Sequence, residues 1–414
     1  MAMPPARAPL HSLTEALALL LATAEPISAT EALATLDADG RVLAADVVSA
    51  LQVPPQDNSS MDGYALRVLD VPAPGVEMPV SQRIAAGTSG APLQPQTVAR
   101  IFTGAPIPAG ADAIVMQEDC LAVAGSDVAR VQVNVVPRSG QWIRRAGEDV
   151  ASGAVVLAKG QRLGPAELGL AASIGMASLS VVKRPRVALF STGDELVMPG
   201  TVAPQDMRAG AIYNSNRFFL NSLLRRMGCE VTDFGIVPDK LDATVQAMRE
   251  ASAAHDVILT SGGVSVGEED HIKPAVQSLG SLDLMQIAIK PGKPFAHGRV
   301  GAAHFIGLPG NPVSSFVTCL LLVRPFLLRL QGVAELAPVA SNLRADFDWP
   351  RADKRQEFLR ARRNAQGGLD LFANQSSGVL TSAVWADGLV DNPGGQTIQK
   401  GDMLRFISFA ELLA

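Results

Sequence analysis

Residues 187–195 read Val-Ala-Leu-Phe-Ser-Thr-Gly-Asp-Glu, a short apolar run followed by a polar turn that contains glycine. The run predicts a buried strand, and the turn predicts the loop at its carboxyl end. Helical and strand-like segments then alternate: helix 216–227, strand 230–236, helix 241–254, strand 257–259, helix 272–279, strands 287–289 and 305–308, and a long helix 312–330. This alternation predicts a doubly wound α/β domain over residues 183–331, with a mainly parallel sheet and helices on both faces.

The segment before this domain contains an apolar run over residues 13–24. Ser12 followed by Glu15 fits a capping box, which favours an amphipathic helix. Residues 22–24 (Ala-Thr-Ala) imitate a signal-peptidase site, but the apolar run is short and Glu15 interrupts it. We therefore predict a helix of the folded protein.

The remaining segments differ in texture. A second helix is expected over residues 30–36, a strand over 41–48, and a helix that begins at Pro165. Frequent proline and glycine from 54 to 137 predict a β-rich domain of short strands. The strand-like pieces after Gln331 predict a small C-terminal β-domain.

The composition argues against several classes of protein. With 414 residues, 48% of them hydrophobic, the chain can form several packed domains. Charged residues make up only 18% and the formal net charge is −5, which argues against general nucleic-acid binding. No uninterrupted run of about 18 apolar residues predicts a membrane span. The three cysteines have no metal-ligand spacing and do not suit a disulfide framework, so we expect a reducing, cytoplasmic setting.

Three loops are expected at the carboxyl edge of the α/β sheet, where open sheets of this kind bind ligands. They span residues 191–195, 261–267 and 309–312. Glycine lets backbone N–H groups approach phosphate oxygens, and the third loop opens a helix with Asn311 as N-cap and Pro312 as first residue. Each loop alone could equally be a tight turn without a ligand. They fit neither the P-loop nor the GxGxxG pattern, which argues against an ordinary nucleoside triphosphatase or dehydrogenase.

Charged residues gather around the same loops. Lys290 and Lys293 flank a Pro-Gly turn, which alone would be an ordinary solvated turn but could here match the charge of an anion. Carboxylates also occur in or near the loops: Asp194, Glu195, Asp239 and Asp270. Carboxylates beside a phosphate site predict a divalent cation, and Mg²⁺ suits a site of few carboxylates with phosphate oxygens and water.

Several motifs together resemble the signatures of one family: residues 57–65 (Asp-Asn-Ser-Ser-Met-Asp-Gly-Tyr-Ala), 103–106 (Thr-Gly-Ala-Pro), 144–149 (Arg-Arg-Ala-Gly-Glu-Asp), 191–196 (Ser-Thr-Gly-Asp-Glu-Leu), 261–267 (Ser-Gly-Gly-Val-Ser-Val-Gly), 290–295 (Lys-Pro-Gly-Lys-Pro-Phe) and 308–312 (Leu-Pro-Gly-Asn-Pro). This is the MoeA/gephyrin family of molybdopterin molybdenumtransferases. The resemblance extends in order from the N-terminal helix to the last β-domain, and several of the motifs are six or more residues long.

The resemblance implies a four-domain protomer. Residues 1–45 and 141–182 would form a discontinuous N-terminal domain, with the β-rich domain 46–140 inserted in it and a β-barrel-like domain over 332–414. Similar proteins are homodimers, whose cleft is built from the α/β domain of one protomer and the inserted domain of the other. They take adenylylated molybdopterin, cleave its pyrophosphate link and use molybdate to give the molybdenum cofactor and AMP.

The resemblance also implies the site residues. The expected catalytic residues are Asp62, Thr103, Asp149, Glu195, Asp239, Asp270, Lys290 and Lys293. The expected substrate-binding residues are Ser191, Thr192, Gly193, Ser261, Gly262, Gly263, Ser265, Gly267, Pro309, Gly310, Asn311, Pro312, Arg360 and Ser377, with Ser376 as an alternative to Ser377. Our hypothesis is that Glu195 and Asp270, with Asp239 or Asp62, hold Mg²⁺ at the pyrophosphate. Molybdate, the substrate anion, would be held by Lys290, Lys293 and Arg360.

Two other functions remain open at this stage. A molybdopterin adenylyltransferase, whose domain resembles residues 186–330, would consume ATP; the motifs at Asp62 and Thr103 lie outside that domain and favour metal insertion. A non-catalytic scaffold, as in the receptor clustering of gephyrin, would bind the pterin without turnover. Other cofactor-biosynthesis proteins are candidate partners, and the choice between molybdate and tungstate stays open because both are tetrahedral dianions.

Overall fold

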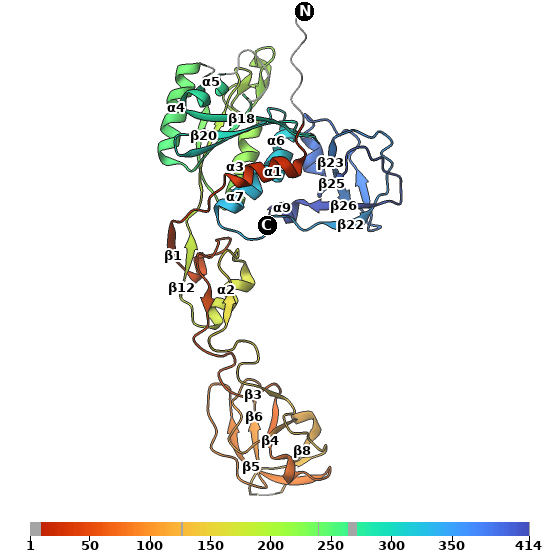
Figure 1. Ribbon diagram of the computed structural model, residues 1–414. Helices are drawn as coiled ribbons and strands as arrows, with labels where there is room; N and C mark the ends of the chain where they lie inside the picture. The colour runs from red at the N-terminus through yellow and green to blue at the C-terminus, as the bar shows by residue number, and fades with distance from the viewer. Residues whose placement is uncertain (1–9, 126, 239, 264–270, 414) are drawn as a thin grey trace, which may run out of the picture.

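The computed structural model describes residues 10–125, 127–238, 240–263 and 271–413. The molecule is elongated (Figure 1). The α/β domain and the C-terminal β-domain lie side by side at one end, and a β-rich distal unit (residues 57–144) forms the other. Between them lies a narrow waist, built from residues 30–50 and 150–182, through which the chain passes twice.

The α/β domain contains a six-stranded sheet in the order β16-β13-β17-β21-β20-β18. Its strands are β13 (Arg186–Ser191), β16 (Glu230–Ile236), β17 (Val257–Ser261), β18 (Gly280–Gln286), β20 (Pro294–Val300) and β21 (Ala303–Leu308). The pairs β13–β16, β13–β17 and β17–β21 are parallel, whereas β20 and β18 add an antiparallel edge. The prediction of a mainly parallel sheet is therefore confirmed.

Helices cover both faces of this sheet, as predicted. They are α3 (Asn216–Arg226), α4 (Leu241–Ala254), α5 (Ile272–Leu279), α6 (Pro312–Thr318) and α7 (Arg324–Leu330), the last two joined by the π-helical turn η5 (Cys319–Val323). One core joins Leu189 of the sheet to Leu220 and Phe326, and the other joins Phe190 to Met248. Because neighbouring residues of β13 point to opposite faces, a single apolar strand supplies both cores.

The continuous helix from Pro312 to Leu330 is long and apolar enough to cross a membrane, but 83% of its apolar window is buried inside the protein. It packs in the same core as α1 (Leu13–Ala22), through Ala16 and Leu20 of α1. The predicted capping box of α1 is present, with the backbone N–H of Ser12 donating to Glu15 Oε2 at 2.8 Å and the reverse bond at 3.2 Å. The prediction of an N-terminal helix is therefore confirmed.

A helix predicted in the waist is a strand in the structure. Residues 30–36, expected to be helical, form strand β1 (Thr30–Ala34) and the start of the 3₁₀ turn η1 (Thr35–Asp37). β1 pairs antiparallel with β12 (Ser178–Val182), and its burial alternates along the strand. The distant partner strand satisfies the backbone of β1, so tertiary pairing overrides the local helix propensity.

In the rest of the waist, one predicted strand is shorter than expected and one predicted helix begins where expected. The strand predicted over 41–48 is reduced to β2 (Val47–Val48), which pairs with β11 (Val155–Leu157). Val42 and Leu43 form only isolated bridges. Helix α2 (Pro165–Ser173) begins at Pro165, as predicted.

The distal unit is β-rich, as expected. Its sheet has the order β7-β4-β6-β5-β9-β8, with β4 (Gly63–Leu66), β5 (Val76–Ile84), β6 (Val98–Ile101), β7 (Ala113–Met116), β8 (Cys120–Val123) and β9 (Arg130–Val133). The pair β3 (Asn58–Ser59) and β10 (Ile143–Arg144) closes the end nearer the waist. A Cβ at Gly63 would lie 2.0 Å from the carbonyl oxygen of Val115, so only glycine allows β4 and β7 to approach this closely.

The C-terminal β-domain is joined to the α/β domain through a shared sheet. Its strands are β22 (Ser341–Arg344), β23 (Gln356–Arg363), β24 (Leu369–Leu371), β25 (Gly388–Asn392) and β26 (Met403–Ser408), and the short helices are α8 (Thr381–Trp385) and α9 (Phe409–Leu413). Strand β19 (Ile289–Lys290), which belongs to the α/β segment, pairs parallel with β23. The Lys290 turn is therefore held between the two domains.

Candidate functional site

The described residues of the three predicted loops meet at one cavity of about 410 Å³ at the carboxyl edge of the α/β sheet. Predicted substrate-binding residues that line it are Thr192, Ser261, Gly262, Pro309, Gly310, Asn311 and Pro312, and Glu195 lines it as well. Leu196, Ile212, Tyr213, Asn214, Ser215, Asn216, Pro294 and Ser314 complete its wall. Because β13, β17 and β21 are parallel neighbours, their end loops converge on the same point.

Glycine allows the first two loops to touch. Gly262 has φ +96°, and a Cβ there would lie 3.1 Å from the carbonyl oxygen of Thr192. Gly263 and Gly193 also have positive φ angles, of +70° and +135°. A Cβ at Gly193 would lie against the carboxylate of Glu195, so this carboxylate folds over the first loop. Side chains larger than hydrogen would separate the loops.

A residue that the sequence prediction missed ties the other loops together. The Asn216 side-chain amide, at the start of α3, donates to Ser261 Oγ at 2.8 Å and to the carbonyl oxygen of Gly310 at 2.7 Å. The bond to Ser261 is buried and the bond to Gly310 is partly buried, and Asn216 itself is only 9% exposed. In the sequence, an asparagine at the start of a helix resembles an ordinary cap. Only the place of Asn216, after a strand that faces the loops, could have suggested that it links Ser261 to Gly310.

We expect Asn216→Ala to lower the free energy of unfolding by about 2 kcal/mol, since Ser261 and Gly310 would lose their donor inside the protein. Urea unfolding of the purified variant measures this loss. Asn221→Ala, on the same helix but outside the cavity wall, is the matched control and should change the free energy less. Equal effects of the two substitutions would contradict the tethering role.

The third loop is closed by the C-terminal β-domain. Asn311 takes the N-cap position and Pro312 is the first helical residue, as predicted, but the Asn311 side chain makes no capping bond. Instead, the backbone N–H of Val313 donates to the carbonyl oxygen of Ser377 at 2.9 Å. Through its backbone carbonyl, Ser377 therefore contacts the helix that borders the cavity.

Arg360 holds the Ser377 loop from inside the β-domain. Arg360 is 1% exposed, and its guanidinium donates to Ser382 Oγ, to the carbonyl oxygen of Phe358 and to that of Ser376. Burial lowers the pKa of Arg360 to about 10. Gln375 makes two hydrogen bonds to the Arg360 backbone. Arg360, which the sequence predicts to bind the molybdate anion, therefore also anchors this loop.

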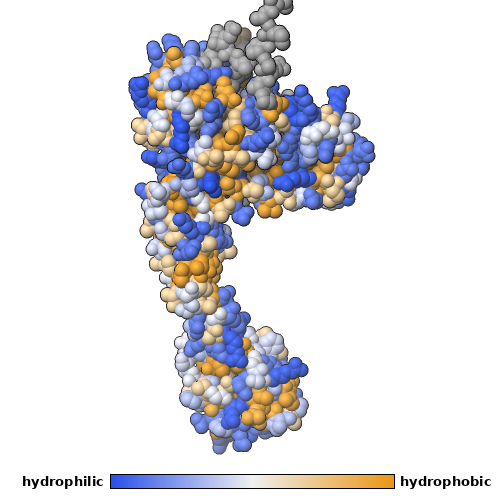
Figure 2. All heavy atoms as spheres, in the orientation of Figure 1, coloured by the Kyte–Doolittle hydropathy of each residue, from blue (hydrophilic) through white to orange (hydrophobic). Residues whose placement is uncertain are grey.

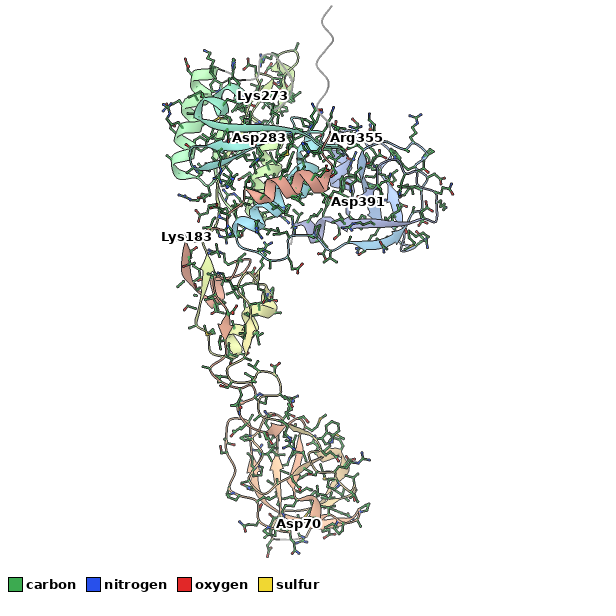
Figure 3. The ribbon with its side chains drawn as sticks, viewed as in Figure 1. Asp70, Lys183, Lys273, Asp283, Arg355 and Asp391 are labelled. Atoms are coloured by element: carbon green, nitrogen blue, oxygen red, sulfur yellow. The ribbon has the colours of Figure 1, made fainter. Side chains whose placement is uncertain are left out.

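Lys290 lies in a cluster of balanced charge. Its ammonium contacts Glu357 Oε1 at 2.9 Å and Asp353 Oδ2 at 3.5 Å, and Arg355 binds Asp353 at 2.8 Å. Arg355 lies where the two domains meet (Figure 3). The hydrogen bonds from Arg355, together with the charge of Lys290, hold the pKa of the Asp353 carboxyl well below its usual range. Lys293 is half-buried, and its ammonium has no hydrogen-bond or ion-pair partner in the described part of the chain.

The described donors suit Mg²⁺ only in part. Glu195 lines the cavity, and its carboxylate has no hydrogen-bond or ion-pair partner among the described residues. Hydroxyl and amide side chains line the same cavity, and their oxygens are hard donors of the kind that Mg²⁺ prefers. Within the described ranges no group of three or more His, Cys, Asp or Glu residues could hold a metal ion. Asp239, Ser265, Gly267 and Asp270 lie outside those residues.

Three other predicted residues, Asp62, Thr103 and Asp149, lie away from this cavity. Thr103 donates from its backbone N–H and its hydroxyl to Asp62 Oδ1, at 2.8 and 2.9 Å, and these bonds lower the pKa of the Asp62 carboxyl. The backbone N–H of Asp149 donates to the carbonyl oxygen of Val53. The waist separates the distal unit from the α/β domain (Figure 1). One chain therefore does not bring the Asp62–Thr103 pair to the cavity.

Comparisons with known proteins cover nearly the whole chain. The MoeA N-terminal region (domain I and II) matches residues 11–175, the probable molybdopterin binding domain residues 188–329, and the MoeA C-terminal region (domain IV) residues 342–409. A molybdopterin molybdenumtransferase of Haemophilus influenzae is 42% identical over 307 residues, 73% of each chain. Molybdopterin molybdenumtransferase 2 of Mycobacterium tuberculosis is 38% identical over 370 residues, 86% of this chain and 89% of the relative.

A solved structure agrees with these relatives. The crystal structure of the molybdopterin biosynthesis MoeA protein from Pyrococcus horikoshii OT3 superposes with a TM-score of 0.83 at 27% identity, covering 97% of this chain and 100% of that one. Sequence and fold thus point to the same proteins along almost their entire length. This chain belongs to the MoeA family.

Proposed function

We propose that this protein is a molybdopterin molybdenumtransferase, which inserts molybdenum from molybdate into adenylylated molybdopterin and releases AMP. The observation that carries the proposal is the cavity, where three glycine-containing loops converge with neutral polar side chains and one carboxylate. Such a wall offers hydrogen-bond donors to phosphate oxygens. The similar proteins are molybdenumtransferases, which supports transfer of molybdenum as the reaction.

The chain's own residues would act by positioning. The loops would hold the pyrophosphate link in one orientation, so that a molybdate oxygen can approach phosphorus as the bond to AMP breaks. Lys293, whose ammonium has no partner in the described chain, would attract the molybdate dianion. Lys290 would keep the Pro-Gly turn in place through Glu357. No covalent enzyme intermediate is required.

Magnesium would complete the site. Glu195, with Asp239 and Asp270, would hold the ion, and bound Mg²⁺ would neutralise charge on the phosphate oxygens. The Glu195 carboxylate in the cavity wall, which has no partner among the described residues, supports this assignment.

A homodimer would supply the Asp62–Thr103 pair. In the proposed dimer, the distal unit of one protomer faces the cavity of its partner, because the distal unit of the same chain is too far away. Exposed apolar residues are compatible with such association: Leu36 is 89% and Val155 56% exposed in the waist, and Leu69 is 82% exposed in the distal unit. The face in Figure 2 shows apolar side chains gathered on the waist. We place this dimer in the cytoplasm, where the three cysteines stay reduced.

The decisive experiment is anaerobic incubation with adenylylated molybdopterin, Mg²⁺ and low molybdate, with AMP and the metallated pterin as readouts. Release of AMP that depends on molybdate supports the proposal. Consumption of ATP instead would identify an adenylyltransferase. Tight pterin binding without AMP release would identify a scaffold.

A further inference from the structure

Two side chains in the cavity wall contain a buried polar atom that has no hydrogen-bond partner in the described part of the chain. They are the side-chain nitrogen Nδ2 of Asn214 and the hydroxyl of Thr192. Asn214 is 1% exposed. Buried donors are almost always paired in folded proteins, so an unpaired one at a cavity indicates a missing acceptor.

The orientation of the Asn214 amide is fixed from two sides. Its backbone N–H donates to the carbonyl oxygen of Val197 at 2.9 Å. Its side-chain Oδ1 accepts the backbone N–H of Arg217, three residues on, in the first turn of α3. The oxygen end of the amide thus binds the first turn of α3, and the nitrogen end, in a residue of the cavity wall, has no partner among the described residues.

The neighbouring Asn216 shows the contrast. Its Nδ2 donates to both Ser261 and Gly310, so that amide is used within the protein. Asn214 lies only two residues earlier in the same cavity wall, yet its donor has no partner among the residues that the structure describes. The difference assigns a structural role to Asn216 and leaves Asn214 available to a ligand.

We propose that Asn214 Nδ2 donates a hydrogen bond to a phosphate oxygen of the adenylylated pterin, and that this contact helps to select a phosphoanhydride. The inference rests on the proposed function of the cavity. A phosphate oxygen is the suitable acceptor because the Thr192 hydroxyl and the Gly262 backbone lie together at the same wall. Because the amide is neutral, its hydrogen bond to the anion adds no further positive charge beside Mg²⁺.

Asn214→Asp is the sharpest test of this contact. The aspartate keeps an oxygen for the Arg217 N–H, but it replaces the donor by a negative charge of nearly the same shape. We expect titration calorimetry with Mg²⁺ and inorganic pyrophosphate or AMP to show about tenfold weaker binding for Asn214→Ala, and a larger loss for Asn214→Asp. The melting temperature of both variants is measured as well, because a carboxylate at this 1% exposed position should lower the stability although the bond to Arg217 N–H is kept, and affinities are compared only at temperatures where both variants are folded.

Asn221→Asp is the matched control, since it adds the same charge within α3, the helix that follows Asn214, but away from the cavity wall, and should leave the affinity unchanged. Wild-type affinity in Asn214→Asp would overturn the inference. Equal losses in the Asp and Ala variants would also overturn it, because the acceptor would then be an uncharged atom such as a pterin carbonyl.

The two proposals fail in different ways. If the wild-type protein releases AMP and the Asn214 variants bind pyrophosphate normally, the proposed function stands and this contact is wrong. If the wild type binds neither pyrophosphate nor AMP, the phosphate site itself is absent and both are wrong. If it binds them and the variants lose affinity, but no molybdate-dependent AMP release occurs, the contact stands and the proposed reaction is wrong.

Discussion

Mixed dimers of Asp62→Ala and Glu195→Ala chains are expected to recover about a quarter of the wild-type AMP release, although each variant alone should be nearly inactive. If the cavity of one protomer is completed by the distal unit of the other, a mixed dimer has one site that carries both lesions and one intact site. Random pairing makes about half of all dimers mixed, and half of their sites are then intact. Co-expression with two different tags, followed by tandem purification, would isolate the mixed dimers and raise their expected activity to about half.

The matched control pairs two lesions of the same unit. Asp62→Ala with Thr103→Ala places both changes in distal units, where Thr103 binds Asp62 Oδ1. Every site of such a mixed dimer receives one damaged distal unit, so no recovery is expected. Recovery in this control, or its absence in the Asp62–Glu195 pair, would show that sites are not shared between protomers in the proposed way.

The α/β domain was predictable because its signals are local and strong. Helices α4 and α5 have the bounds expected from the sequence, since their apolar residues recur with a helical period. Strand β1 was not predictable, because Glu31 and Leu33 acquire their alternating burial only by pairing with β12, far along the chain. Short segments of mixed propensity are decided by such distant partners.

The loops of the site were recognisable from glycine, proline and their places after strands, whereas the contacts of single polar residues were not. Lys290 contacts Glu357, 67 residues away, and Arg360 is buried in a strand where a charged residue would ordinarily be exposed. Asn214 and Asn216 resemble ordinary helix caps in the sequence. Only the fold distinguishes the amide used by the protein from the one left for a ligand.

The stability of the α/β domain should fall steeply in mild acid because of His304. This residue of β21 is 5% exposed, its Nδ1 has no partner within the described residues, and its ring packs edge-on against Phe326 at 4.9 Å between centroids. Burial lowers the pKa of His304 to about 4, and the positive charge of Arg299 acts in the same direction. The folded protein therefore keeps this imidazole neutral.

The sign of the effect follows from proton uptake. The unfolded chain protonates His304 near pH 6.5, whereas the folded chain does so near pH 4, so the unfolded state binds more protons between these values. The stability contributed by the neutral imidazole is present above pH 6.5 and is lost as the pH falls towards 4. The full loss is about 3 kcal/mol, of the same order as removing a large core side chain.

His304→Leu removes this titration while keeping an apolar contact with Phe326. Urea unfolding at pH 7.5, 5.5 and 4.5 should give a clearly shallower loss of stability for the variant than for the wild type. His297, another buried histidine with a lowered pKa, accounts for part of the remaining slope, so the double variant with His297→Leu should be flatter still. Identical slopes in all three proteins would mean that the acid sensitivity comes from other groups, such as the paired carboxylates, and not from a proton excluded from the core.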